Sequence, residues 1–158
     1  MKIIFLDIDG VLNSTSSAIV YNGYNQLDPV SIGLLKELTV RTGAQIVISS
    51  TWRFRFNREE FIELFSKYGW KKAPIISMTE KSVPDGVTRG HEIDEWLTRH
   101  KEITEFVILD DSTDFLPEQR NNLVLVSNVD GLRFKHMCKA LRILGNPDKE
   151  LEHILERT

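Results

Sequence analysis

Cysteine is nearly absent from this sequence, since Cys138 is the single one among 158 residues. One cysteine cannot form a disulfide within the chain, which argues against a disulfide-stabilised secreted fold. Cys138 shares an apolar helical pattern with Met137, Leu141 and Leu144, which indicates a packed side chain and not a nucleophile. A reducing, cytoplasmic setting is therefore expected.

Long hydrophobic runs are also missing. No segment approaches the ~20 apolar residues that a membrane-spanning helix needs. The apolar run at residues 3–6 is far shorter than the core of a signal peptide, and Asp7 and Asp9 interrupt it at once. We therefore expect neither membrane insertion nor secretion.

Charge of one sign is not in large excess. The formal net charge is −3, with 27% charged and 41% hydrophobic residues, which is typical of a globular protein without disorder. This balance argues against a protein that coats nucleic acid through its overall charge, although it is compatible with a local basic patch at an active site. The length suits a single domain over residues 1–158, and no stable protein partner is predicted.

Strand-like and helix-like segments alternate along the chain. Short apolar segments are expected as strands at residues 2–8, 44–48, 75–77, 106–109 and 123–126. Helices are expected from Pro29 to just before Gly43, and at residues 59–68, 90–100, 134–144 and about 148–156. This alternation predicts an α/β domain in three layers, with a five-stranded parallel sheet covered by helices on both faces.

Two polar stretches interrupt the alternation, at residues 13–28 and 77–89. We expect the first as a loop or flap after the first strand and the second as an exposed loop. Each follows a predicted strand, and sites in open parallel sheets lie at the carboxyl ends of strands. Neither stretch is long enough for a large cap domain.

Acidic residues follow two of the predicted strands. Asp7 and Asp9 lie in the run FLDIDGVLN (residues 5–13), and Asp110 and Asp111 lie in FVILDDSTD (residues 106–114). One aspartate-glycine turn alone is a common surface feature. If the two strands are neighbours, however, these carboxylates converge and repel one another unless a hard cation lies among them. Because no histidine or cysteine is near, magnesium is favoured over zinc.

A third strand end offers hydroxyl groups and then cations. Ser49, Ser50 and Thr51 follow a buried strand, where hydroxyls and backbone amides are suited to hold phosphate oxygens. Aromatic and cationic residues then alternate from Trp52 to Arg58. Such a segment either stacks on bases and binds phosphates or places its aromatic rings in the core, and both interpretations are open.

These strand ends together resemble the motifs of the haloacid dehalogenase (HAD) superfamily. The matches follow the family's order: Asp7 and Asp9 for the first motif, Ser49 or Ser50 for the second, and Asp110, Asp111 and Asp114 for the fourth. The runs SSTWR, RGHEI and VILDD are more narrowly similar to the HAD domains of RNA repair proteins and of polynucleotide kinase-phosphatases. The resemblance covers roughly residues 1–130 and implies a Rossmann-like, HAD-like domain without a large cap.

The third motif departs from the family pattern. That motif is usually a lysine near the start of the helix before the fourth-motif strand, and Arg89 stands there in this sequence. A guanidinium group binds phosphate well through its fork of N–H donors. Lys81 lies further upstream in the same loop and is the alternative, unless neither residue serves.

The resemblance implies a magnesium-dependent phosphatase that works through an aspartyl-phosphate. It implies Asp7 as nucleophile, Asp9 as general acid and base, and Ser49 or Ser50 with Arg89 as ligands of the phosphoryl oxygens. Metal ligands are implied among Asp7, Asp9, Asp110, Asp111 and Asp114. The other substrate-binding residues are expected to be Gly10, Asn13, Thr51, Trp52, Arg53 and Lys81.

Several functions remain open on this reading. The expected substrate is a phosphorylated small molecule, a nucleotide or a nucleic-acid end that carries a 3′-phosphate. A non-catalytic domain that binds magnesium and phosphate, and a phosphotransferase on the same fold, are the alternatives. Asp9 argues against a dehalogenase, which needs no leaving-group acid there. A response-regulator-like receiver would want a lysine after the fifth strand, and residues 127–130 contain none.

Overall fold

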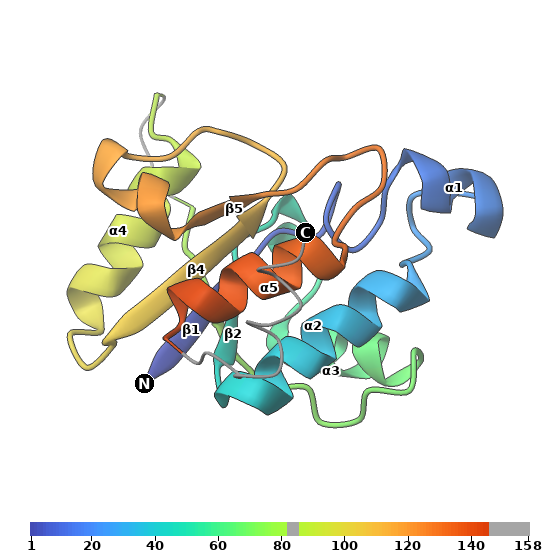
Figure 1. Cartoon of the computed structure of the whole chain (residues 1–158), viewed down its shortest axis with the longest axis horizontal. Coiled ribbons are helices and arrows are strands. Elements are labelled where there is room, and N and C mark those ends of the chain that lie inside the picture. The colour runs from blue at the N-terminus through green and yellow to red at the C-terminus, as the bar shows by residue number, and fades with distance from the viewer. Residues whose placement is uncertain (82–85, 146–158) are drawn as a thin grey trace, which may run out of the picture.

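The computed structural model describes residues 1–81 and 86–145. Within this part of the chain the strands are β1 (Lys2–Leu6), β2 (Gln45–Ile48), β3 (Ile75–Met78), β4 (Glu105–Asp110) and β5 (Leu123–Leu125) (Figure 1). The α-helices are α1 (Thr15–Tyr21), α2 (Pro29–Thr42), α3 (Arg58–Ser66), α4 (Arg89–Arg99) and α5 (Phe134–Ile143), and the short 3₁₀ helices are η1 (Thr51–Phe54) and η2 (Pro117–Asn122). The helix expected at about residues 148–156 lies outside the described residues.

The strands form one parallel sheet in the order β3-β2-β1-β4-β5. The predicted α/β fold with a five-stranded parallel sheet is therefore confirmed. Leu6 at the end of β1 aligns with Ile48 of β2 and Leu109 of β4. The residues that follow these three strands consequently meet at one edge of the sheet.

Helices cover both faces of the sheet, as the three-layer expectation requires. Residues of α2, α3 and α5 share one core cluster with the strands, whereas α4 packs on the opposite face around Ile93 and Trp96 (Figure 1). Right-handed crossovers are expected to place α2 and α3 on one face and α4 on the other, because the chain moves from β1 toward β3 and then turns back to β4. The switch point therefore lies between β1 and β4, where open α/β sheets bind their ligands.

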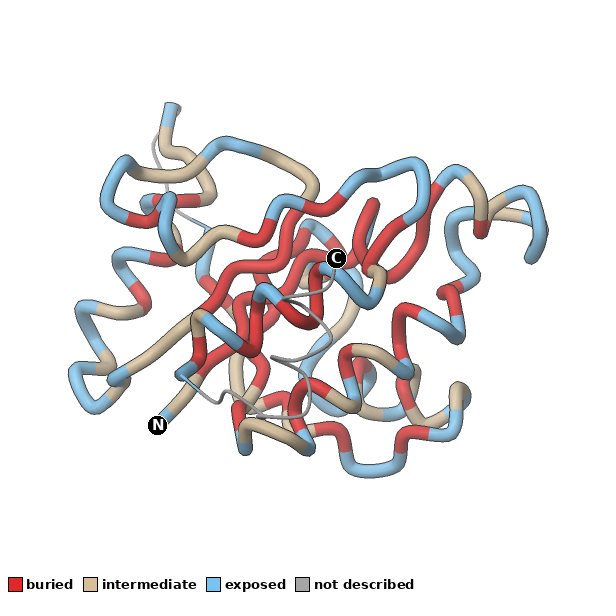
Figure 2. Tube along the Cα trace, in the orientation of Figure 1, coloured by how far each residue is buried: buried red, intermediate tan, exposed pale blue. Residues whose placement is uncertain are grey.

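The core runs through the strands and the inner sides of the helices (Figure 2). Ile4, Leu6, Ile46 and Val107 are fully buried, which is the physical reason for near-continuous apolar runs in the sequence of a sheet covered on both sides. The predicted packing of Cys138 is confirmed, since this thiol is buried.

The main difference from the sequence-based expectation lies in residues 13–28, which contain the helix α1 as well as loop. Ser14 caps this helix: its Oγ accepts from the Ser17 amide, and the Ser14 amide donates to Ser17 Oγ. A capping box built from two serines is easily missed, because its second position usually holds glutamate or glutamine. None of the helices described is long and apolar enough to cross a membrane.

Candidate active site

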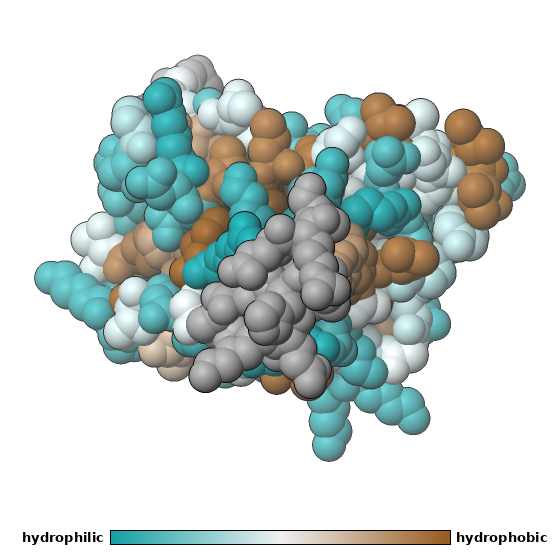
Figure 3. All heavy atoms as spheres, in the orientation of Figure 1, coloured by the Kyte–Doolittle hydropathy of each residue, from teal (hydrophilic) through white to brown (hydrophobic). Residues whose placement is uncertain are grey.

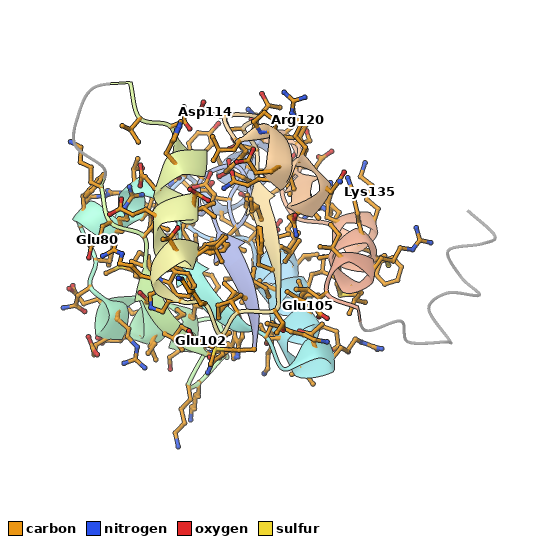
Figure 4. All side chains as sticks on the ribbon, turned by 90° about the vertical axis from the view of Figure 1, so that its left-hand side faces the viewer. Glu80, Glu102, Glu105, Asp114, Arg120 and Lys135 are labelled. Atoms are coloured by element: carbon orange, nitrogen blue, oxygen red, sulfur yellow. The ribbon has the colours of Figure 1, made fainter. Side chains whose placement is uncertain are left out.

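Three strand ends bring the polar residues of the site together. Asp7 continues the β1–β4 pairing, since its amide donates to the Leu109 carbonyl at 3.0 Å. Ser49 continues the β1–β2 pairing in the same way, with its amide 2.8 Å from the Leu6 carbonyl oxygen. Figure 4 shows Asp114 near this end of the sheet and Glu105, the first residue of β4, near the other. The expectation that the acidic ends of the first and fourth strands meet is thus met.

The side chains of Asp7, Ser49 and Asp110 leave the sheet toward the face covered by α4. Each comes two residues after a strand residue that packs under α4, namely Phe5, Val47 and Ile108. Side chains two residues apart on an extended chain point to the same face of the sheet. The strand residues that pack under α4 therefore predict that the polar residues two positions later also lie on this face. Arg89, the first residue of α4, lies on this same face.

The Asp7 carboxyl is 4% exposed and is held by both main-chain and side-chain donors. Its Oδ1 accepts from the Ile8 amide at 2.8 Å, and its Oδ2 lies 3.1 Å from Arg89 Nη1. Burial, followed by the negative charge of Asp110, raises the pKa of Asp7 from 3.8 to about 8, even though Arg89 acts in the opposite direction. Burial and a neighbouring carboxylate therefore outweigh the charge of Arg89 at this group.

Arg89 joins the two strand ends. Its Nη1 lies 3.1 Å from Asp7 Oδ2 and 2.7 Å from Asp110 Oδ2. Burial lowers the pKa of Arg89, but the two aspartates outweigh burial and raise it above its usual value, so the guanidinium stays charged. Of the two cations considered from the sequence, the structure places Arg89 in the site. Lys81 instead lies beside Phe54, with its Nζ 5.8 Å from the ring centroid.

Three carboxylates are close enough to share a metal ion. Asp7, Asp110 and Asp111 each offer an oxygen within 4.8 Å of the others. Asp110 Oδ1 also accepts from the Ser112 amide at 2.9 Å, and burial raises the pKa of Asp110 despite the charge of Arg89. This all-oxygen, partly buried set suits a hard cation such as Mg²⁺. Among the described residues the set contains neither the Asp9 carboxyl nor Asp114.

The two serines of the second motif differ in their surroundings. Ser50 is buried, and its Oγ accepts from the Trp52 amide at 3.2 Å, so it caps the 3₁₀ helix η1. Ser49 Oγ is buried as well, but among the described residues it has no hydrogen-bond partner. A buried hydroxyl without a partner is unfavourable in the free protein, so Ser49 offers an uncommitted donor on the side of Asp7.

Asp9 extends from the loop after β1 and is exposed. Its Oδ1 accepts from Trp52 Nε1 at 3.0 Å and from Asn13 Nδ2 at 2.9 Å. The expectation that Trp52 and Asn13 bind substrate stays a prediction; in the structure both residues are buried, and their side-chain N–H groups donate to Asp9. In the structure they hold Asp9 and the loop after β1 in place, and they do not form an exposed surface.

Arg53 is also committed within the protein. It forms an ion pair with Glu92 of α4, and its Nη1 donates to the Ser50 carbonyl at 2.9 Å. Burial, despite Glu92, lowers the pKa of Arg53, and burial likewise raises the pKa of Glu92 despite Arg53. Arg53 therefore links η1 to α4, which joins the second-motif strand to the helix that carries Arg89.

Several of the candidate residues line a hollow of about 250 Å³ at this edge of the sheet. Its lining residues are Asp7, Asp9, Thr51, Arg89, Asp111, Ser112 and Asp114. Thr51 is exposed, which is compatible with its expected contact with substrate. The hollow thus combines the predicted nucleophile, the predicted acid and a cation in one space.

Two glycines allow close approach of the chain around this hollow. Gly10 has a φ of +79°, and a Cβ there would lie 2.6 Å from the Asp111 Cγ atom. Gly10 therefore allows a backbone turn close to Asp111, a candidate metal ligand, and its expected contact with substrate stays a prediction. Gly90 directly follows Arg89, and a Cβ there would lie 2.7 Å from the Leu116 amide nitrogen and 2.8 Å from the Phe115 Cα.

Gly90→Ala is expected to displace the first turn of α4, and Arg89 with it, because the obstructing atoms belong to the backbone. We expect catalytic efficiency to fall about 100-fold, the scale of a misplacement near 1 Å, with a stability loss of about 1–3 kcal/mol. Steady-state kinetics and thermal unfolding measure the two effects. Gly33→Ala in α2 is the matched control, because nothing lies within 4 Å of its added Cβ. Equal behaviour of the two variants would contradict the close-approach argument.

Sequence reasoning missed the residues that hold this arrangement in place. Gln119 Oε1 accepts from the Leu116 amide at 3.0 Å and its Nε2 donates to the Gly90 carbonyl at 2.8 Å, so it connects η2 to the start of α4. Glu92, the partner of Arg53, was also not foreseen. Its position three residues after Arg89 is a sequence signal, because this spacing places both on one side of a helix.

Comparison with protein families identifies the chain. Residues 3–137 match the family described as the HAD domain in Swiss Army Knife RNA repair proteins. The chain belongs to this family. Membership in this HAD family confirms the resemblance seen in the motifs and indicates phosphatase-type hydrolase chemistry. Searches of the curated proteins and of the solved structures give no match.

Proposed function

We propose that this HAD domain is a magnesium-dependent phosphatase that hydrolyses a phosphate monoester through an aspartyl-phosphate on Asp7. The observation that carries the proposal is the contact of Asp7 Oδ2 with Arg89 Nη1 at 3.1 Å, in a hollow that Asp9 also lines. Asp7, Arg89 and Asp9 line one small space, and this supports the proposed roles of carboxylate nucleophile, phosphate-binding cation and proton donor.

The chemistry follows from these positions. An oxygen of Asp7 attacks phosphorus while Asp9 gives a proton to the departing ester oxygen, which leaves as an alcohol. Asp9 then takes a proton from the water that attacks the phosphorylated Asp7, and inorganic phosphate is released. Arg89 and the Ser49 hydroxyl hold the phosphoryl oxygens through both steps.

The residues present suit a magnesium ion. Asp7, Asp110 and Asp111 would hold it, with the Asp9 backbone carbonyl as a further oxygen ligand implied by the family resemblance. When bound, Mg²⁺ supplies positive charge that favours the ionised form of Asp7 and offsets charge on the phosphoryl oxygens. Three carboxylates lie together at this point, and burial, followed by the charge of Asp110, raises the pKa of Asp7; both features support this proposal.

A nucleotide or a nucleic-acid end with a 3′-phosphate is the proposed substrate class. Two further hollows border the active-site hollow and offer room for more than a phosphate group. The larger, of about 610 Å³, shares Asp111 and Ser112 with the site and extends to Lys135, which Figure 4 labels, and His136. Figure 3 shows hydrophobic surface beside α5 and β5 on this face, and the exposed large hydrophobic residues of these elements are Leu125 and Phe134.

The second bordering hollow, of about 250 Å³, shares Thr51, Arg89 and Asp114 with the site. Phe54 lines it and is 57% exposed, with the Arg53 guanidinium 4.6 Å from its ring centroid. An exposed ring beside cations is suited to stack on a base near a phosphate. Of the aromatic residues after the second motif, Phe54 therefore supports base stacking, while Trp52 is buried in the core.

A phosphate-release screen tests the proposed function. The purified protein is incubated with p-nitrophenyl phosphate, nucleoside 3′- and 5′-monophosphates, and oligonucleotides phosphorylated at either end, with Mg²⁺ or with EDTA. We expect Mg²⁺-dependent release, with the highest kcat/KM for a 3′-phosphorylated nucleotide or oligonucleotide. Binding of Mg²⁺ and phosphate without release from any ester would favour the non-catalytic alternative.

A further inference from the structure

The carboxyl group of Asp9 is held asymmetrically. Both of its hydrogen bonds among the described residues end on Oδ1, from Trp52 Nε1 at 3.0 Å and from Asn13 Nδ2 at 2.9 Å. Its Oδ2 receives no hydrogen bond in the described parts of the chain. An exposed aspartate without such contacts would sample several rotamers, so these two donors restrict where the acid lies.

The chemistry of the two donors decides which oxygen remains available. An indole N–H donates and never accepts. The Asn13 amide is oriented by its surroundings, because its Oδ1 accepts from the Gly10 amide at 2.8 Å and its Nδ2 also donates to the Tyr24 carbonyl at 2.6 Å. Asp9 Oδ1 is therefore an acceptor for both neighbours, and Oδ2 is the oxygen left to exchange a proton with substrate.

Trp52 is itself fixed before any substrate binds. It is 3% exposed, and its ring stacks on Phe56 with the centroids 5.6 Å apart. Its amide donates to Ser50 Oγ, and the Arg55 guanidinium lies 5.1 Å from the centroid of its ring. The indole N–H thus projects from a packed position in η1 to a carboxylate on the loop after β1.

We propose that Trp52 is a positioning residue for Asp9: its indole N–H holds Oδ1 so that Oδ2 faces the departing ester oxygen. This inference deepens the proposed function and rests on it. As Asp7 attacks, the bond between phosphorus and the ester oxygen breaks, and the Oδ2 proton passes to that oxygen. In the second step Oδ2 takes one proton from water, which balances the cycle.

Leaving-group dependence separates positioning from simple packing. Trp52→Phe keeps an aromatic ring against Phe56 and removes the N–H. We expect kcat/KM for an alkyl ester, glycerol 2-phosphate, to fall about 30-fold, since general acid catalysis contributes about 10²–10⁴-fold and misorientation forfeits part of it. For p-nitrophenyl phosphate, whose leaving group departs without protonation, we expect a change below about 3-fold.

Trp96→Phe is the matched control. Trp96 is buried to the same degree, and its Nε1 donates to Ser77 Oγ at 3.2 Å, away from the active-site hollow. Trp96→Phe should change the rates for both esters equally, if at all. Asp9→Asn removes the acid itself. It should therefore show the largest difference between the two esters in the loss of kcat/KM, and this difference is the upper limit for Trp52→Phe.

A measurement without substrate checks the contact itself. In ¹⁵N-labelled protein, the indole N–H signal of Trp52, assigned by its loss in Trp52→Phe, should move and exchange faster with solvent in Asp9→Ala. The Trp70 and Trp96 indole signals should stay in place. An unchanged Trp52 signal would overturn the inference.

The kinetic outcomes are equally decisive. Equal losses for both esters in Trp52→Phe, with the wild type active, would overturn the positioning role and leave the proposed function standing. No Mg²⁺-dependent release from any ester by the wild type would overturn the proposed function and this inference together.

Discussion

Asp7→Asn should reduce phosphate release by at least about 10⁴-fold, because an amide cannot form the acyl-phosphate that a carboxylate nucleophile forms. The same change should stabilise the metal-free protein. Burial and the charge of Asp110 raise the pKa of Asp7 from 3.8 to about 8. Folding therefore favours the protonated group, and the wild type loses stability as the pH rises from about 4 toward 8.

Urea unfolding at pH 5, 7 and 9 in EDTA measures this linkage. We expect the free energy of unfolding of Asp7→Asn to exceed that of the wild type by about 2 kcal/mol at pH 7 and above, and by less at pH 5. This expected gain in stability is smaller than the free energy that corresponds to the full pKa shift, because Arg89 loses one of its two charged partners in Asp7→Asn. Asp94→Asn, an exposed change on α4, is the control and should leave the pH slope unaltered. If the free energy of unfolding depends on pH in the same way in the wild type and in Asp7→Asn, the raised pKa of Asp7 would be refuted.

Arg89→Met should have the opposite effect on stability. It leaves the buried carboxyls of Asp7 and Asp110 without the cation that lies 3.1 Å and 2.7 Å from them. Removing one partner from a buried ion pair typically destabilises by about 3–5 kcal/mol, and we expect about 3 kcal/mol at pH 8 and less at pH 5. Loss of the phosphate-binding cation should also lower kcat/KM about 10³-fold.

A double-mutant cycle tests whether the two residues act on each other. The loss caused by Arg89→Met should be smaller in the Asp7→Asn background by at least about 1 kcal/mol, because one buried carboxylate has been removed. Arg99→Met, at the exposed end of the same helix, is the matched control and should show no coupling with Asp7. If the effects of Asp7→Asn and Arg89→Met on the free energy of unfolding are additive, the two residues do not stabilise each other in the folded protein, which would contradict this prediction.

The positions of the acidic residues were predictable for a simple reason. A strand buried on both sides needs a continuous apolar run, so the first carboxylate after such a run marks where the strand leaves the core. Asp7 and Asp110 stand at these points. The alternation of side chains along β1 and β4 then directs both carboxyls to the face of α4.

The role of Trp52 was beyond this reasoning. An alternation of aromatic and cationic residues fits a nucleic-acid surface and a packed loop equally well. In the structure Trp52 is buried, Phe54 is exposed and Phe56 is intermediate. One part of the segment is therefore packed in the protein, and another part is available at the surface. The contact between Trp52 and Asp9 spans 43 residues and depends on how η1 leaves β2.

The sequence by itself determined the parallel α/β class, the order of the motifs, the family and the strand ends at which carboxylates and hydroxyls occur. These features depend on local hydrophobic patterning, which the chain carries in linear form. Only the tertiary structure placed Arg89 beside Asp7 and Asp110 and Lys81 beside Phe54. It also left Ser49 Oγ without a hydrogen-bond partner among the described residues while Ser50 caps η1, and it joined Trp52 to Asp9. Such choices depend on distances between segments far apart in the chain, and those distances are set by the packing of α4 and η1 against the sheet.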